Sequence, residues 1–137
     1  MTPTEKRLRL ARAWLDKARG DLEAARAIRD VRTVPGWILG FHLQQAAEKA
    51  WKGRLVLCGT MPPGVHDLAR ILEMRTGQAS PTEQIKALIA SLQPFAVEDR
   101  YPLLTPREMP CHEIAILLPQ VEAEVEALAD ELASDGA

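Results

Sequence analysis

The sequence predicts an all-α fold, an up-and-down four-helix bundle with a broken third helix, in a single domain spanning residues 1–137. Apolar residues recur at steps of three and four through long stretches, which is the period of an amphipathic helix. No stretch alternates with period two for long enough to demand a strand, and aromatic residues make up only 4% of the chain, which argues against a sheet core. Short breaks between the stretches favour helices that pack as antiparallel neighbours.

The first helix is expected to run from Thr4 or Glu5 to Asp30. Small and large apolar residues alternate along its seam, as in bundles whose helices approach closely. Gly20 costs about 1 kcal/mol relative to alanine inside such a helix. A threonine, a proline and a glycine between positions 33 and 36 then break the chain. The seam consists of Leu8, Ala11, Leu15, Ala18, Leu22 and Ala25.

The stretch from Trp37 to Gly59 is predicted to form one helix around which the other helices pack. Its apolar stripe should fill the core. At 100° per residue, a row of polar residues falls within about 80° on one side of the helix, beside that stripe. The same helix is therefore expected to fill the core and to carry two cations, an imidazole and an amide. The polar row consists of His42, Gln45, Lys49 and Lys52.

Two shorter helices are expected next, and they could form one kinked third arm of the bundle. Asp67 is predicted to cap the first through its carboxylate, with Gly77 as its end. Ser80, Pro81 and Glu83 indicate the start of the second, because they supply an N-cap, a first-turn proline and a capping-box acid.

The stretch 95–110 is predicted to be mostly irregular, because prolines recur from position 94 to position 110. The last helix is expected to begin at Cys111 and to bend at Pro119. Its end, residues 134–137, should fray.

Charge is divided unevenly along the chain. Residues 1–75 carry 14 Lys and Arg against 8 Asp and Glu, whereas residues 76–137 carry 3 against 11. One interpretation is that basic and acidic helices lie side by side and neutralise one another. The other is that the first half presents a surface to anions such as phosphates.

The composition also excludes several classes of protein. Two cysteines form neither a disulfide framework nor a metal-ligand cluster. No run approaches the 18 uninterrupted apolar residues of a membrane span, and neither a GxGxxG nor a GxxxxGK[ST] motif is present. We therefore expect a cytoplasmic protein that uses no cofactor or metal and does not bind membranes.

Three segments of the chain carry a recognisable pattern, in this order: FHLQQAAEKAWKGRLVLCG, PPGVHDLARILE and EDRYP. Together they resemble the HEPN family, the domains of higher eukaryotes and prokaryotes associated with nucleotide binding. The resemblance extends from the first helix into the last. It implies a four-helix bundle, commonly a homodimer, that often pairs with a small nucleotidyltransferase in a two-component, toxin–antitoxin-like system.

The polar residues of these segments are candidates for binding a nucleotide. Lysine and arginine would pair with phosphate oxygens, and Tyr101 or Trp51 would stack on a base. Each candidate also has a packing role open to it, such as a hydrogen bond between helices, a cap or a loop anchor, so a purely structural helical adaptor is the alternative. The candidates are His42, Gln45, Lys49, Lys52, His66, Asp67, Arg100 and Tyr101.

A second pattern indicates a different activity. Some HEPN relatives resemble metal-independent RNases that place an arginine, four to six residues and a histidine near the start of the last helix. Arg107 and His112 have this spacing. Histidine would act as general acid or base on a 2′-hydroxyl of RNA, and arginine would stabilise the phosphorane charge. Glu108, in place of a small polar residue, and Pro110 depart from the pattern.

Overall fold

The computed structural model describes residues 1–75, 80–98 and 107–135. Within these ranges it contains five α-helices, four of them long, and no strands, which confirms the prediction of an all-α bundle. The helices are α1 (Pro3–Ile28), α2 (Gly36–Leu57), α3 (Leu68–Glu73), α4 (Glu83–Glu98) and α5 (Cys111–Asp135). None of the helices in the described part of the chain is long and apolar enough to cross a membrane.

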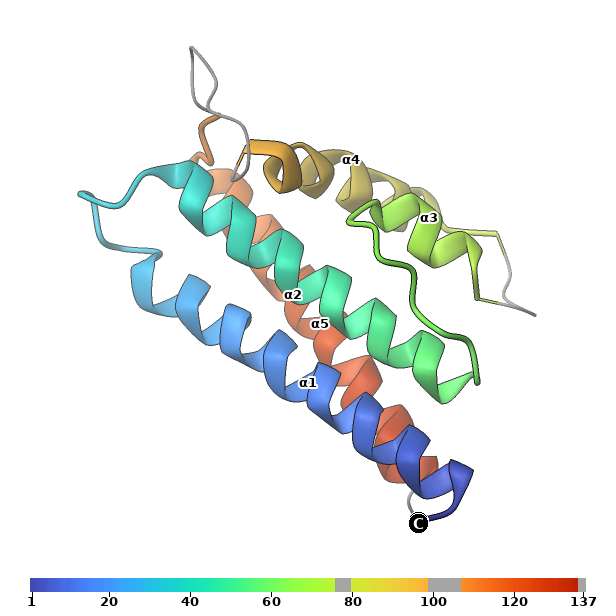
Figure 1. Ribbon diagram of the computed structural model, residues 1–137. Helices are drawn as coiled ribbons and strands as arrows, with labels where there is room; N and C mark the ends of the chain where they lie inside the picture. The colour runs from blue at the N-terminus through green and yellow to red at the C-terminus, as the bar shows by residue number, and fades with distance from the viewer. Residues whose placement is uncertain (76–79, 99–106, 136–137) are drawn as a thin grey trace.

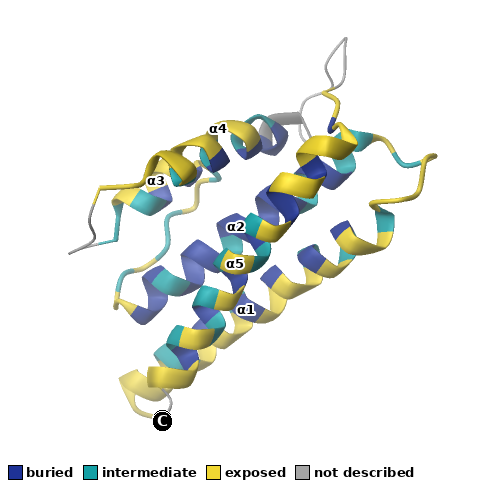
Figure 2. Ribbon diagram, turned by 180° about the vertical axis from the view of Figure 1, so that it is seen from behind, coloured by how far each residue is buried: buried dark blue, intermediate teal, exposed yellow. Residues whose placement is uncertain are grey.

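The long helices form an up-and-down bundle in which α1 and α4 run one way and α2 and α5 the other (Figure 1). Helix α2 is central, because it packs against each of the other four. The third arm is made of two pieces, as expected, but they do not share one kinked axis. The chain runs outward along α3 and returns along α4 (Figures 1 and 2).

Helix α1 begins earlier than predicted because Thr2 is its N-cap. The Thr2 hydroxyl accepts a hydrogen bond from the Glu5 backbone N–H at 3.1 Å, and the Glu5 carboxylate accepts one from the Thr2 backbone N–H at 3.0 Å. This reciprocal pair is a capping box and satisfies two donors that the first turn leaves free. At the other end, α1 ends at Ile28 rather than Asp30.

The predicted cap of α3 is confirmed, but that of α4 is wrong. Asp67 accepts hydrogen bonds from the backbone N–H groups of Ala69 and Arg70 at 3.0 and 3.3 Å. Helix α4 begins at Glu83, and the Thr82 hydroxyl, rather than Ser80, accepts a bond from Ile85 N–H at 3.2 Å. A hydroxyl next to the first turn reaches those N–H groups, whereas Ser80 lies too far ahead of it. Gly77 lies outside the described residues.

Helix α4 also continues further than expected, through Pro94 to Glu98. The irregular segment predicted from position 95 is therefore helical at its start. A proline removes only its own donor and distorts the preceding turn. Phe95 and Ala96 are each only 5% exposed, and the burial of these two residues stabilises the last turn against that loss.

Helix α5 begins at Cys111, as predicted, after an irregular segment at residues 107–110. It includes Pro119 and runs to Asp135, so residues 134 and 135, which were expected to fray, are helical.

The core lies around α2, whose residues are buried along most of its length, whereas α1 and α5 expose their outer faces (Figure 2). Trp51 is fully buried, and its indole N–H donates to the Glu124 carboxylate at 3.2 Å. At Gly40 the backbone of α2 approaches α4 so closely that an added Cβ would lie 2.5 Å from the Phe95 ring. Only glycine permits this contact.

Ion pairs connect the basic part of the chain to α5, and they support the interpretation that the two halves neutralise one another. Burial would lower the pKa of Arg26, but hydrogen bonds to Glu23 and Glu122 outweigh it and raise the pKa above its ordinary value. The pairs are Arg19–Glu126 at 3.8 Å, Arg26–Glu122 at 3.3 Å, Arg54–Glu131 at 2.6 Å and Arg75–Glu131 at 3.7 Å.

Candidate functional site

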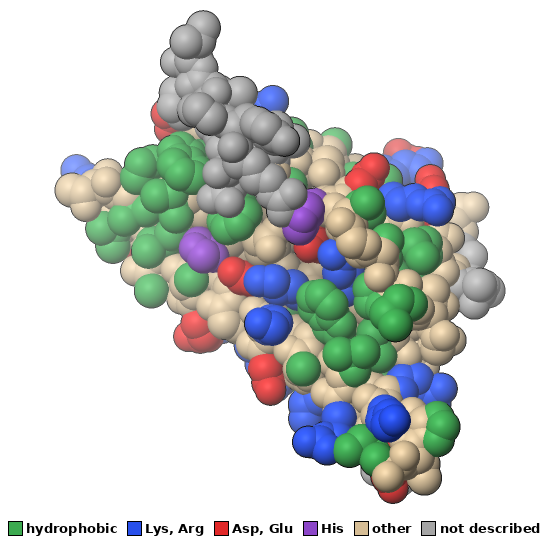
Figure 3. All heavy atoms as spheres, viewed as in Figure 1, with side chains coloured by type: hydrophobic (Ala, Val, Ile, Leu, Met, Phe, Trp, Pro, Cys, Tyr) green, Lys and Arg blue, Asp and Glu red, His purple; other side chains and the backbone are tan. Residues whose placement is uncertain are grey.

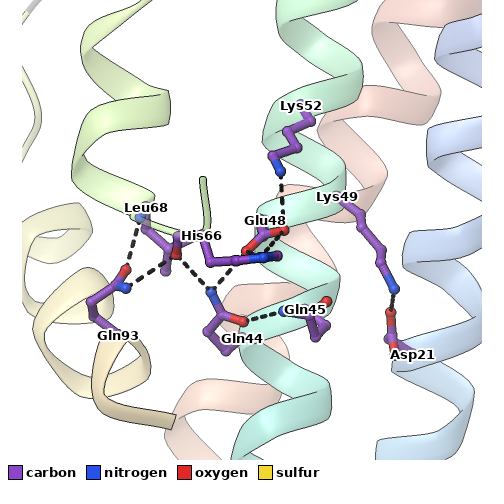
Figure 4. Close-up of polar contacts among 9 residues, drawn as sticks. All are labelled: Asp21, Gln44, Gln45, Glu48, Lys49, Lys52, His66, Leu68 and Gln93. Atoms are coloured by element: carbon purple, nitrogen blue, oxygen red, sulfur yellow. Dashed lines mark hydrogen bonds and ion pairs between the residues drawn. The ribbon is translucent and has the colours of Figure 1, made fainter. Parts of the chain in front are cut away.

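The polar residues of α2 divide into two groups, each arranged around one carboxylate (Figure 4). Glu48, with Gln44, Lys52 and His66, faces the segment that leads into α3, and we call these four residues the Glu48 cluster. Asp21 of α1, with His42 and Lys49, forms the Asp21 cluster.

Three members of the Glu48 cluster, Glu48, Gln44 and Lys52, are buried, whereas the His66 side chain is 33% exposed. The side chains of Glu48 and Lys52 are only 3% and 7% exposed, and the Lys52 ammonium lies 3.3 Å from the carboxylate. His66 Nδ1 lies 2.9 Å and Gln44 Nε2 3.2 Å from Glu48 Oε1. Because a carboxylate accepts hydrogen bonds, His66 Nδ1 carries the proton. The Lys52 ammonium also lies 5.7 Å from the centre of the Trp14 ring, a cation–π distance.

Further amides connect this cluster to α3 and α4. Gln44 and Gln93 both donate to the His66 carbonyl, at 3.2 and 3.1 Å. Gln93 Oε1 accepts from the Leu68 backbone N–H at 2.8 Å, and Gln45 donates to Gln44 at 2.6 Å. The network therefore holds the segment before α3 against two long helices, and its members satisfy one another, as buried polar groups must.

The Asp21 cluster joins α1 to α2 and is more open. His42 Nδ1 lies 2.9 Å from Asp21 Oδ1, and the Lys49 ammonium donates to Asp21 Oδ2. The side chains of His42 and Lys49 are 28% and 23% exposed, and that of Asp21 is 12% exposed. On the face of the molecule that Figure 3 shows, acidic, basic and histidine side chains gather across the middle, between areas of hydrophobic side chains.

The structure brings the predicted nucleotide-binding residues together in pairs. Glu48 joins Lys52 to His66, and Asp21 joins His42 to Lys49. Of the remaining candidates, Gln45 is bonded to the Glu48 cluster through Gln44, Asp67 is an exposed helix cap, and Arg100 and Tyr101 lie outside the described residues.

Of the two roles open to Trp51, packing in the core is confirmed and stacking on a base is excluded. Its side chain is fully buried and its indole N–H is bonded to Glu124, so no ring face is open to a ligand.

Sequence reasoning missed Asp21, Gln44 and Gln93 as parts of these networks. A signal exists for Gln44 alone. It stands four residues before Glu48, which stands four residues before Lys52, so the three form a polar line along one face of an otherwise apolar helix. Asp21 and Gln93 belong to other helices, and nothing in their local sequence indicates the contact.

The second candidate pair, Arg107 and His112, is exposed at the start of α5. Arg107 belongs to the irregular segment, whereas His112 is the second residue of the helix, so the two side chains do not share a helical turn. Met109, between them, is buried against the start of α2, where an added Cβ at Gly36 would lie 2.7 Å from Met109 N.

A cavity of about 450 Å³ adjoins this segment. Glu108, Met109 and Cys111 line one side of it, and the connection between α1 and α2, including Arg29 and Arg32, lines the other. In the described part of the chain, no three His, Cys, Asp or Glu side chains are placed to hold a metal ion.

The fold and these networks define a helical-bundle domain that has a buried polar cluster on its second helix. A model of the HEPN domain matches residues 11–128, and the chain belongs to the HEPN family. The bundle is also similar to the crystal structure of TT1696 from Thermus thermophilus, with a TM-score of 0.65 and 22% sequence identity. That similarity covers 91% of this chain and 97% of TT1696, and it shows a shared fold. A search of curated proteins finds no match.

Proposed function

We propose that this HEPN-domain protein binds a nucleotide at the Asp21 cluster and works with a small nucleotidyltransferase in a two-component, toxin–antitoxin-like system. The observation that supports the binding site is the partly exposed set of His42, Lys49 and Asp21 on the shared face of α1 and α2. An ammonium that is held near the surface can exchange its carboxylate partner for a phosphate oxygen, because water already competes for it.

The two clusters have different parts in this proposal. Lys49 binds phosphate, His42 donates to phosphate or base, and Asp21 accepts from ribose hydroxyls. Glu48 holds Lys52 in the interior and also holds His66, whose side chain is 33% exposed. In this proposal both residues position α2 and the segment before α3 and do not contact the ligand.

Calorimetric titration with ATP and the other nucleoside triphosphates tests the site. His42→Ala and Lys49→Ala should each weaken binding about ten-fold, the equivalent of about 1.4 kcal/mol. Lys6→Ala is the matched control, since Lys6 is an exposed cation at the far end of α1, and its removal should leave affinity unchanged. Unchanged affinity in the His42 and Lys49 variants would refute the site. Lys52→Ala is a poor test, because loss of a buried ion pair also destabilises the fold.

The partnership has its own test. A nucleotidyltransferase encoded beside this chain should co-purify with it when the two are expressed together. Light scattering on the chain alone should give the mass of two chains, as a HEPN homodimer requires. If the chain binds nucleotide but the nucleotidyltransferase does not co-purify with it, the proposed partnership is refuted and the proposed nucleotide site is not.

A metal-independent RNase is the second candidate function. It is supported by the exposure of Arg107 and His112, which are next in sequence to Glu108 and Cys111 of the cavity of about 450 Å³. Arg29 and Arg32 line that cavity and suit an RNA backbone, while Asp30 and Glu108 in the same lining offset part of their charge.

Purified protein incubated with structured and single-stranded RNA in the presence of a chelator should then produce cleavage that His112→Ala and Arg107→Ala abolish. Cleavage that is equal in the wild type and in His112→Ala, or absent from both, would exclude this activity.

A further inference from the structure

The start of α1 carries cations that the protein leaves without acidic partners. Further along the same helix, Arg19 and Arg26 pair with carboxylates of α5. Among residues 1–12 the sequence has one acidic side chain, Glu5, whose carboxylate is bonded to the Thr2 backbone N–H. Within the described residues, no cation of this stretch forms an ion pair with a carboxylate. The four cations are Lys6, Arg7, Arg9 and Arg12.

The acidic end of α5 lies at the same end of the bundle (Figure 1), but its carboxylates have other surroundings. Asp130, Glu131 and Asp135 line a cavity beside the last turn of α2. Glu131 pairs with Arg54 and Arg75. The positive charge at the start of α1 therefore remains available to an acidic group from another molecule.

A cavity of about 230 Å³ lies beside these cations, between the start of α1 and the turn that follows α2. Lys6 and Arg7 line it, and no carboxylate of the described chain does. Two of its apolar side chains, Leu10 and Met61, are 44% and 78% exposed. At this end of the molecule hydrophobic side chains lie among basic ones (Figure 3). The apolar lining consists of Leu10, Val56, Met61 and Pro62.

Hydrogen bonds fix the turn that forms one wall of this cavity. Gly59 N–H donates to the Val56 carbonyl at 2.9 Å, and Thr60 N–H donates to the Leu55 carbonyl at 3.0 Å. Gly59 has a φ of 82°, a left-handed conformation that glycine adopts without steric cost. The Arg7 guanidinium lies beside the turn, because an added Cβ at Gly59 would be 4.0 Å from Arg7 Nη1. A wall that is already ordered lowers the entropy cost of binding.

The size and the lining of this cavity favour a peptide as the ligand. About 230 Å³ is below the range of about 300–1,000 Å³ that is typical of small-molecule sites, but it can admit one apolar side chain. No aromatic side chain of the described chain lines the cavity, so none is placed to stack on a nucleic-acid base. Exposed methionine is common at surfaces that bind peptides, and an exposed apolar patch with a polar rim marks an interaction site.

We propose that this cavity binds an acidic peptide segment of a partner protein. The segment inserts one apolar side chain between Leu10 and Met61, and its carboxylates pair with Lys6 and Arg7. Of the three guanidinium nitrogens of Arg7, Nε alone is buried without a partner, so the carboxylate contacts Nη1 or Nη2. Arg7 and Asp21 are fourteen residues apart on α1, about 20 Å. The proposal therefore does not depend on nucleotide binding at the Asp21 cluster.

Selection from a random peptide library displayed on phage, with the purified chain as the target, tests the kind of ligand. We expect enrichment of sequences that place Asp or Glu next to Leu, Met or Phe. Enrichment of neutral or basic sequences, or no enrichment, would overturn the proposal. Vesicles of phosphatidylglycerol should not bind the chain, and their binding without peptide enrichment would assign this surface to a membrane instead.

A synthetic copy of the selected peptide then measures affinity by fluorescence anisotropy. Binding should weaken as the salt concentration rises, because exposed charges are screened. Replacing the acidic residues of the peptide by their amides, or its apolar residue by alanine, should each weaken binding about ten-fold. If the amide form binds as tightly as the acidic form, the cations do not contribute and the proposal is wrong.

Matched variants of the chain locate the site. Arg7→Gln and Met61→Ser should each weaken binding of the peptide about ten-fold. Lys17→Gln, at an exposed cation of the same helix, and Ile116→Ser, at a residue of α5 that is 57% exposed, should bind as the wild type does. Lys6→Gln replaces Arg7→Gln if circular dichroism shows that the latter is unfolded, since Lys6 is exposed. Equal weakening by the control variants, or full binding by the site variants, would overturn the proposal.

Discussion

The carboxylates of Glu48 and Asp21 bind the same kinds of side chain but differ in how far they are buried. Each carboxylate contacts one lysine ammonium and the Nδ1 atom of one histidine, and both Nδ1 contacts are 2.9 Å long. The Glu48 side chain is 3% exposed and the Lys52 side chain 7%, whereas the corresponding values for Asp21 and Lys49 are 12% and 23%.

The difference shows that burial, more than residue type, decides what such a cluster can do. Around Glu48 and Lys52 little water competes, although the His66 side chain is 33% exposed, so the two buried charges depend on each other. The cluster therefore fixes the positions of α2, α3 and α4. Around Asp21 water competes, so the lysine and histidine can change partners at low cost. We therefore infer a structural role for the first cluster and propose the second as the ligand site.

The largest expected effect comes from breaking the buried cluster. Glu48→Leu leaves the buried Lys52 ammonium, the buried Gln44 amide and the half-buried His66 ring without their acceptor. We expect the free energy of unfolding to fall by about 3–5 kcal/mol, the cost of leaving a buried charge unpaired. Urea denaturation followed by circular dichroism measures this change.

A second substitution shows whether the stability is lost because the Glu48–Lys52 ion pair is broken or because the packing around Glu48 changes. Lys52→Met in the Glu48→Leu background removes the stranded charge at similar volume, and it should restore a large part of the stability, because a buried pair can often be replaced by apolar residues. If the double variant is no more stable than Glu48→Leu, the ion pair is not what Glu48 contributes.

A smaller effect is expected at the open cluster. Asp21→Asn keeps a hydrogen-bonding side chain beside His42 and Lys49 but removes the charge. Since Lys49 can turn to solvent, the loss of stability should be about 1 kcal/mol. Nucleotide affinity should rise, because the phosphate no longer competes with a carboxylate for Lys49, while the asparagine amide oxygen can still accept from a ribose hydroxyl. Urea denaturation measures the change in stability, and calorimetry measures the change in affinity. If Asp21→Asn lowers the stability as much as Glu48→Leu does, the two clusters do not differ in their structural role.

Much of the fold was predictable because it depends on local pattern. The period of the apolar residues gave the four long helices, and the Asp67 side chain gave the start of α3. The errors lie where a distant contact or a neighbouring hydroxyl decides the outcome. Helix α4 passes Pro94 because Phe95 is buried against α2, and its cap is Thr82 because that hydroxyl is the nearer one.

The site was predictable only in part. Helical geometry placed His42, Lys49 and Lys52 on one side of α2, but it could not show that Lys49 turns to α1 while Lys52 is drawn inward by Glu48. The partner of each lysine depends on which carboxylate lies close to its ammonium group, and that carboxylate can belong to the same helix or to another one. Asp21 is distant in the sequence, and its contact with α2 exists only once the bundle has formed.

The smallest expected change in stability comes from a substitution at Gly20, the position next to Asp21. Gly20 lies in the middle of α1, and an added Cβ would meet nothing within 4 Å. Gly20→Ala should therefore raise the free energy of unfolding by about 0.4–1 kcal/mol, because alanine loses less backbone freedom on folding. Nucleotide affinity should stay unchanged, since no side chain of the Asp21 cluster is touched. A change in affinity without a change in the contacts of Asp21 would mean that the stiffness of α1, and not its charge, governs the open cluster.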